Sequence, residues 1–494
     1  MSISFLKTHK FSLLLLLSGI AFYWAFAYDL QRWDFVKLIT LYAGLFFVSY
    51  KLIQFHKNQF WVLAGIALLF RLVFLFAVPN LSQDFYRFIW DGKLILEGIN
   101  PYLSTPNELI KDSSFVGMTY DFKTTLVEGM GSLSAGNFTN YPPISQFCYA
   151  IAAWLGGKSI LGNILVMRML IIAADFGTLW FGRKILQKFK LPEHRIFWYV
   201  LNPFIIIELT GNLHFEGMML FFFIWGMYLF FNRKWIWAAV LIGLSVSVKL
   251  LPLLFLPLFV KWCFNNRSTV LKKVHNFSPL GGNAVSKGGF SENVSFWQGG
   301  FPFSKLILFY VVIMGTVFLS FLPFLSDEFF QNFISSLALW FQKFEFNASF
   351  YYLIRWIGFQ TVGWNIISTV GKILPLIVLF FVLSLAFFRK NPRWLSGPER
   401  LFTAMLFAVC AYFFLSTTVH PWYLATPLLF SVFTKYRFVL VWSFVVFFSY
   451  SAYGKTGFDE ILWLVALEYF VVFGILAKEL WKGKKAFRWN TKNA

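Results

Sequence analysis

Two carboxylates and two cations lie close together in the stretch Asp84-Phe-Tyr-Arg87-Phe-Ile-Trp-Asp91-Gly-Lys93. If this stretch is helical, Asp84, Arg87 and Asp91 fall on one face. A carboxylate there could accept a proton from a hydroxyl, while Arg87 or Lys93 could bind an anionic group such as a phosphate. The competing interpretation is an ordinary ion-pair face on a solvated helix.

A second polar cluster lies in Gly211-Asn212-Leu213-His214-Phe215-Glu216-Gly217, where a turn between two apolar segments is expected. Amide, imidazole and carboxylate groups at a membrane rim could bind sugar hydroxyls or a phosphate. A polar hairpin tip is the equally simple alternative.

Three cationic or titratable positions follow further along the chain. Lys249 has apolar sequence on both sides, so it either extends to the headgroups or binds a phosphate. His420, in Val-His-Pro-Trp-Tyr423, is expected at the same outer level, where a neutral imidazole can donate or accept a hydrogen bond. A structural interfacial histidine is the alternative. Arg355 is a further candidate for binding phosphate.

The composition excludes a soluble globular protein. Of the 494 residues, 58% are hydrophobic and 22% aromatic, and only 13% are charged, against about 25% in soluble domains. The net charge of +21 is carried by short Lys/Arg clusters between apolar runs, so we attribute it to cytoplasmic loops rather than to a nucleic-acid surface. The spacing of the three cysteines predicts neither a zinc site nor a disulfide framework.

The apolar runs predict a single all-α domain, residues 1–494, with a bundle of about 12–14 transmembrane helices. The run 235–262 is expected to contain two helices that meet at Lys249 and Pro252. The short run 144–156 is expected to be re-entrant or interfacial. The remaining runs are 11–28, 38–54, 60–79, 161–182, 195–210, 217–231, 305–324, 372–388, 401–417, 421–434, 437–453 and 459–480.

The basic clusters set the expected topology, because cytoplasmic loops carry excess Lys and Arg. Residues 80–143 then form a first large external loop and 325–371 a second external region, both with amphipathic helices along the membrane surface. Residues 265–304 form a flexible cytoplasmic loop. The clusters are Lys51 to Lys57, Arg183 to Arg195, Arg233-Lys234, Lys261 to Lys273, Arg389 to Arg400 and Lys478 to Arg488.

Taken in order, these motifs resemble the GT-C class of integral-membrane glycosyltransferases, especially the bacterial polyprenyl-phosphate-mannose-dependent mannosyltransferases. The similarity covers most of the chain. The motifs are Asp84 to Lys93, Gly-Ile-Asn-Pro-Tyr at 98–102, Tyr-Pro-Pro at 141–143, Asn-Pro at 202–203, Asn212 to Glu216, Lys249-Leu-Leu-Pro and His420-Pro-Trp-Tyr.

The resemblance implies transfer of a hexose, mannose in that family, from a polyprenyl-phosphate carrier to an acceptor hydroxyl on the external face of the cell membrane. It also implies inversion and an Asp general base, for which Asp84 is the matching position and Asp91 its rival. This chain departs from the common pattern in the order of its Asn and His, which weakens a role for His214 and leaves Glu216 in the place of an expected Asp.

The remaining candidates divide by the group that they would bind. The phosphate could bind Arg87, Lys93, Lys249, Arg355 and His420, and sugar or acceptor hydroxyls could bind Asn100, Tyr102, Asn212, His214, Glu216 and Tyr423. No cofactor is required, because the cations could neutralise the leaving phosphate, although a divalent metal stays open. The expected partners are the lipid-linked donor, a glycan, lipid or protein acceptor, and membrane lipid, without nucleic acid.

Two other classes of function would also give many helices with polar residues. A transporter or flippase of lipid-linked glycans should carry its charged residues near the middle of the membrane. The predicted clusters instead gather at one rim, which favours chemistry there. A glycan polymerase or ligase is an alternative within enzymes.

Overall fold

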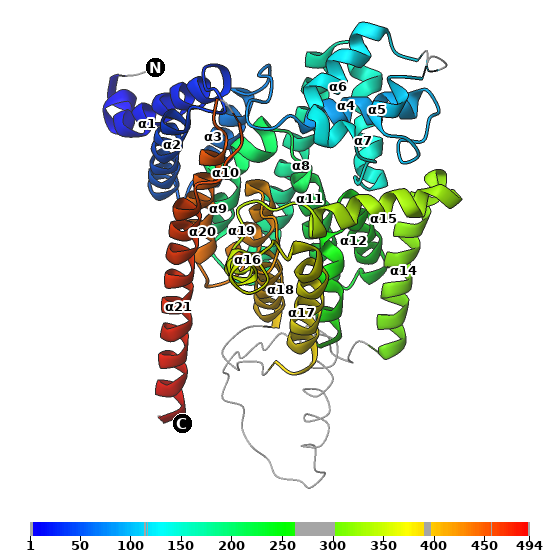
Figure 1. Ribbon diagram of the computed structural model, residues 1–494. Coiled ribbons are helices and arrows are strands. Elements are labelled where there is room, and N and C mark those ends of the chain that lie inside the picture. The colour runs from blue at the N-terminus through cyan, green and yellow to red at the C-terminus, as the bar shows by residue number, and fades with distance from the viewer. Residues whose placement is uncertain are drawn as a thin grey trace.

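The computed structural model describes residues 3–112, 115, 117–261, 302–389, 397–455 and 457–492. Among these residues every regular element is helical, and the strand-like pairings are two isolated bridges. Figure 1 shows the long helices side by side in one bundle, with the helices of residues 84–156 gathered at one end. The prediction of an all-α polytopic membrane protein is confirmed.

Five helices among the described residues are long and apolar enough to cross a membrane, and a bent pair could make a sixth. Shorter apolar helices, such as α3 (Phe60–Leu72), fall below the ~20 residues that span a bilayer alone. The expected total of 12–14 spans therefore stays a prediction. The five are α1 (Ile3–Tyr28, apolar from Lys10), α2 (Phe35–Phe55), α8 (Ile160–Lys188), α14 (Phe303–Phe321, with η4 Leu322–Phe324) and α17 (Ile367–Phe387).

The first expected external region is a helical unit. The stretch that carries the first polar cluster forms helix α4 (Asp84–Leu96), and the short run after Pro142 is helix α7 (Pro143–Gly156). The backbones of α4 and α7 nearly touch at Gly92, where a Cβ would lie 2.3 Å from the carbonyl oxygen of Tyr149. Between them lie α5 (Pro106–Leu109) and α6 (Tyr120–Ala135).

Two broken helices bring polar residues to the inside of the bundle. The helical segment Pro203–Gly211, which ends in the π-helical turn η2 (Ile206–Gly211), meets α11 (Glu216–Phe231) at 113°, with Leu213 at a φ of 63° in the break. Helix α12 (Trp235–Val248) ends where Lys249 takes an extended backbone, and the 3-10 turn η3 (Leu251–Phe255) follows. The predicted division of 235–262 at this point is confirmed.

The second expected external region contains two helices, α15 (Asp327–Gln342) and α16 (Phe350–Thr361). Phe330 and Ile334 on α15 are exposed, which suits a helix that lies along a membrane surface. The predicted loop 265–304 lies outside the described residues as far as position 301. The other elements are η1 (Glu193–Ile196), α9 (Phe197–Val200), α10 (Pro203–Ile205), α18 (Gly397–Phe414), η5 (Pro421–Leu424), α19 (Ala425–Val432), α20 (Phe438–Val445), η6 (Val446–Ala452) and α21 (Leu462–Lys492).

Candidate functional site

The carboxylate of Asp91 is fully buried and fully engaged. Its Oδ1 accepts from Arg87 Nε at 2.7 Å, and its Oδ2 accepts from Thr139 Oγ1 at 2.6 Å and from Gln146 Nε2 at 2.9 Å. Arg87 also donates to the carbonyl oxygens of Ser134 and Asn137. This pair therefore ties α4 to the end of α6, to the segment that follows it and to α7.

The carboxylate of Asp84, at the start of the same helix, has no hydrogen bond or ion pair to any described residue. The side chain is half-buried. Burial raises the pKa of Asp84 above its ordinary value, Lys249 and Arg32 lower it, and Glu216 raises it. Asp84 is thus a partly desolvated carboxylate that shares a site with two cations and one further carboxylate.

Lys249 and Glu216 form an ion pair with 2.5 Å between Nζ and Oε1. They come from the two helix breaks, at the end of α12 and the start of α11. Lys249 Nζ also lies 5.9 Å from the centre of the Tyr141 ring, and the side chain is partly exposed. The break in α12 therefore directs Lys249 toward the Tyr-Pro-Pro segment and Asp84.

The turn of residues 212–215 is held by buried hydrogen bonds. Asn212 accepts from the amide of Leu81 at 3.3 Å and donates to Glu208 at 3.3 Å, and Glu208 accepts from Tyr450 Oη at 2.7 Å. The bond to Leu81 joins this turn to the segment that leads into α4. Asn212 thus holds the scaffold of the site. His214 Nε2 lies 3.8 Å from Glu208 Oε2 and has no hydrogen-bond partner among the described residues.

Three rings stack beside the ion pair. The rings of His214 and Trp422 are 3.8 Å apart and 16° from parallel, and those of Trp422 and His420 are 4.4 Å apart and 4° from parallel. Tyr423 meets His420 edge-on at 5.4 Å. Burial lowers the pKa of His420 to about 3, helped by Arg32 and Lys249, so this imidazole is neutral at physiological pH. The second polar cluster and the His-Pro-Trp-Tyr motif therefore meet in space.

Arg32 belongs to the same site, although sequence analysis passed over it. It lies in the turn between α1 and α2, and its guanidinium stacks 3.4 Å from the centre of the Tyr453 ring. The sequence did contain an indication of its importance. An arginine just after the first apolar run lies on the expected external side, whereas basic residues are usually concentrated in cytoplasmic loops.

Four of the predicted binding residues are engaged elsewhere. Lys93 Nζ donates to the carbonyl oxygen of Ala153 at 2.8 Å, and Arg355 pairs with Glu345 at 3.0 Å. Asn100 donates to the carbonyl oxygen of Phe324, and Tyr102 Oη donates to that of Tyr141. None of these four is among the groups that shift the pKa of Asp84.

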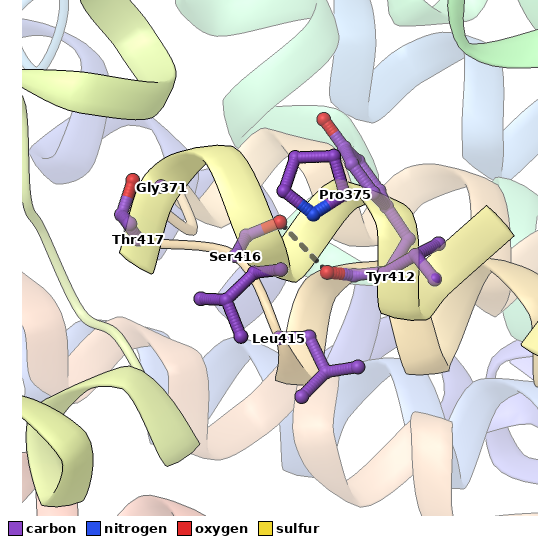
Figure 2. Close-up of a pocket in the computed structure, with 8 residues that line it drawn as sticks. Gly371, Pro375, Tyr412, Leu415, Ser416 and Thr417 are labelled. Atoms are coloured by element: carbon purple, nitrogen blue, oxygen red, sulfur yellow. Dashed lines mark hydrogen bonds between the residues drawn. The ribbon is translucent and has the colours of Figure 1, made fainter. Parts of the chain in front are cut away.

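Among the described residues, neither a group of metal-ligating side chains nor a further pocket extends the cluster around Asp84. No group of three or more metal-ligating side chains occurs among the described residues, and the prediction that no metal is required stays untested. A small pocket between α17 and α18 has apolar walls, and Ser416 Oγ in it donates to the carbonyl oxygen of Tyr412 at 2.7 Å (Figure 2). It contains none of the predicted site residues.

Residues 23–265 match the family model described as the N-terminal domain of alpha-(1->6)-mannopyranosyltransferase. This range includes Arg32, Asp84, Glu216 and Lys249, and it ends before His420. The resemblance to integral-membrane mannosyltransferases is therefore confirmed over these residues.

Curated relatives agree with the family model over part of their length. Alpha-(1->6)-mannopyranosyltransferase A of Corynebacterium glutamicum is 24% identical over 38% of this chain and 36% of the relative. The protein of the same name from Mycobacterium tuberculosis is 23% identical over 38% of this chain and 34% of the relative. Alpha-(1->6)-mannopyranosyltransferase B of Corynebacterium glutamicum is 23% identical over 30% and 23%. The chain thus spans about a third or less of these relatives, and no solved structure matches it.

Proposed function

We propose, on the premise of this match to the alpha-(1->6)-mannopyranosyltransferase family, that the chain is a membrane glycosyltransferase. It transfers a hexose, mannose by similarity, from a polyprenyl-phosphate carrier to an acceptor hydroxyl at the external face of the cell membrane. The observation that carries this proposal is the surroundings of Asp84. Its carboxylate is half-buried, has no partner among the described residues and is coupled electrostatically to two cations.

In the proposed reaction Asp84 is the general base. Its carboxylate takes the proton of the acceptor hydroxyl, and the hydroxyl oxygen forms a bond to the anomeric carbon from the face opposite the phosphate. The bond between that carbon and the phosphate oxygen breaks, and its electron pair leaves with the polyprenyl phosphate. One glycosidic bond forms and one glycosyl-phosphate bond breaks, with inversion at the anomeric carbon.

Lys249 and His420 are proposed to bind the donor phosphate. Lys249 is the cation that the break in α12 directs toward Tyr141, and His420 lies in the ring stack beside it. Fixed cations stabilise the charge that collects on the leaving phosphate, so the reaction does not need a metal. Tyr423 and Glu216, at the same site, are proposed to bind sugar or acceptor hydroxyls.

Asp91 is proposed to be structural. A carboxylate that already accepts three hydrogen bonds and faces Arg87 at 2.7 Å has little capacity to accept a substrate proton. We assign to Arg87, Lys93, Asn100, Tyr102 and Arg355 the same scaffold role, because each is engaged by a described neighbour.

Reconstituted protein tests the proposal directly. Purified chain in liposomes should move label from radiolabelled polyprenyl-phosphate-mannose to a fraction of a cell-envelope extract, and should release polyprenyl phosphate in equal amount. A flippase would move the intact donor across the bilayer without releasing polyprenyl phosphate. Movement without release would therefore contradict the enzyme and favour the transporter alternative.

A further inference from the structure

Arg32 is partly buried, and it differs from the buried arginines in the hydrogen bonds that it makes. Arg71 pairs with Asp175, and Arg87 pairs with Asp91. Arg168 donates to four carbonyl oxygens. Arg32 has no hydrogen bond or ion pair to a described residue, and its buried Nε lacks an acceptor. A buried donor without an acceptor is unfavourable unless a ligand supplies one.

The turn that carries Arg32 is held firmly against the segment before Asp84. Asn80 Nδ2 donates to the carbonyl oxygens of Phe26 at 2.7 Å and Leu30 at 3.1 Å. On the other side of the turn, Asp34 caps α2 by accepting from the amide of Lys37. Hydrogen bonds therefore hold the short turn on both sides of Arg32.

The guanidinium itself is held by an aromatic ring. Its Cζ lies 3.4 Å from the centre of the Tyr453 ring, which makes a cation–π contact. Stacking leaves the N–H groups at the edge of the plane available, and their fork geometry matches two oxygens of a phosphate.

The positive charge of Arg32 acts electrostatically on residues of the candidate site. It lowers the pKa values of Asp84, His420 and Tyr453, three residues from separate segments of the chain. Lys249 acts on Asp84 and His420 as well, but it has Glu216 at 2.5 Å. Of the two cations at the site, Arg32 is therefore the one without an ion pair to a described residue.

We propose that Arg32 binds the phosphate of the polyprenyl-phosphate donor, through two edge N–H groups of its guanidinium. This inference rests on the proposed function and adds a residue to it. As the bond to the anomeric carbon breaks, the phosphate gains negative charge, and Arg32 stabilises the polyprenyl phosphate that leaves.

Two measurements on Arg32→Gln and Arg32→Lys test the role. The first is turnover of the donor in liposomes, where kcat/KM should fall about 10- to 100-fold in Arg32→Gln. Arg32→Lys should restore only part of this loss, because an ammonium group cannot bind two phosphate oxygens with a planar pair of N–H groups as a guanidinium does. The second is binding of polyprenyl phosphate, read as displacement of a labelled analogue, which should weaken by a similar factor. Binding of the uncharged polyprenol should not change.

Lys37→Gln is the matched control. It removes a cation from the same turn, but Lys37 faces Asp29 at 2.6 Å rather than the site. Donor turnover and phosphate binding should stay within about twofold of wild type, as expected of an exposed ion pair. Tyr453→Leu, which removes the stacking ring, should weaken phosphate binding as Arg32→Lys does.

The outcomes separate this inference from the proposed function. Unchanged polyprenyl phosphate binding in folded Arg32→Gln protein overturns the role of Arg32, even if the wild type transfers sugar. A wild type that binds polyprenyl phosphate through Arg32 without transfer overturns the proposed function only. Equal displacement by phosphatidic acid vesicles or by inorganic phosphate overturns the assignment to the donor, because it indicates a general phosphate site.

Discussion

Asp84 and Asp91 lie two helical turns apart on α4, and their carboxylates have opposite surroundings. Asp91 accepts bonds from Arg87, Thr139 and Gln146, so that both of its oxygens are occupied. Asp84 has no partner among the described residues, and its pKa responds to Arg32 and Lys249 on other segments. Helix α4 thus carries one carboxylate that holds the fold together by hydrogen bonds and a second that is available to a substrate.

The comparison indicates which carboxylate in a cluster of charged residues is available for catalysis. An Asp that pairs with an Arg four residues earlier is stabilised as an anion and holds the fold together. Asp84 is the first residue of its helix, and the charged groups that shift its pKa come from other segments. The spacing of the charges alone does not separate the two.

The largest effect is expected from Asp84→Asn. The change keeps the size of the side chain but removes its basicity, so turnover should fall by about 10²–10⁴. Donor binding and the melting temperature should change little, because no described residue bonds to this carboxylate. Turnover is measured in liposomes, donor binding by titration and stability by the melting temperature. Turnover close to that of the wild type would indicate that another carboxylate is the base.

Asp91→Asn should act on stability instead. Removing one partner of a buried ion pair leaves Arg87 uncompensated, which costs about 3–5 kcal/mol of folding free energy. A lower melting temperature in detergent and a smaller folded yield are the expected readings. Arg87→Gln is the matched variant and should destabilise to a similar extent, while turnover per folded molecule stays within a small factor of wild type.

Lys249→Met and Glu216→Gln should shift the pH dependence in opposite directions. Asp84 must be deprotonated to act, so kcat/KM falls as the pH drops through its pKa. Lys249 lowers this pKa and Glu216 raises it. The acidic limb should therefore move to higher pH in Lys249→Met and to lower pH in Glu216→Gln.

Donor binding provides a second test of the Lys249→Met variant. Lys249→Met should also raise the donor KM about tenfold or more, since a hydrogen bond to a charged group is worth about 1.5–3 kcal/mol. Acidic limbs that shift in the same direction in both variants would contradict the electrostatic coupling to Asp84.

His420→Ala should give the smallest change. Because the pKa of His420 is lowered to about 3, the ring is neutral and offers one hydrogen bond without charge. Donor affinity should weaken about threefold to tenfold, the equivalent of about 1 kcal/mol. The loss should not vary between about pH 5 and 8, unlike that of an unperturbed histidine. An unchanged donor titration in folded protein would remove His420 from the phosphate site.

Local signals were sufficient to predict several elements. The short apolar helix after Pro142 and the breaks near Asn212 and Lys249 follow from hydrophobic runs and from proline and glycine positions. These features depend on neighbours in sequence. The ion pair of Lys249 with Glu216 was not predicted, because it depends on how the two breaks pack against each other.

Tertiary packing determined what the sequence could not predict. Lys93 and Arg355 were candidates for the phosphate, but whether a cation has a protein partner depends on which helix packs against it. Arg32 lies far from Asp84 in sequence, in a turn without a motif, and Asn80 joins that turn to the segment before α4. The stack of His214, Trp422 and His420 likewise joins the two halves of the chain.

The central claim is that Asp84, rather than Asp91, takes the proton of the acceptor. The most direct test compares sugar transfer by Asp84→Asn and Asp91→Asn in the same liposome preparation, at saturating donor and per folded molecule. We predict that Asp84→Asn is slower than wild type by about 10²–10⁴, whereas Asp91→Asn transfers sugar at close to the wild-type rate. A folded Asp91→Asn protein that is inactive, beside an active Asp84→Asn protein, would contradict the account.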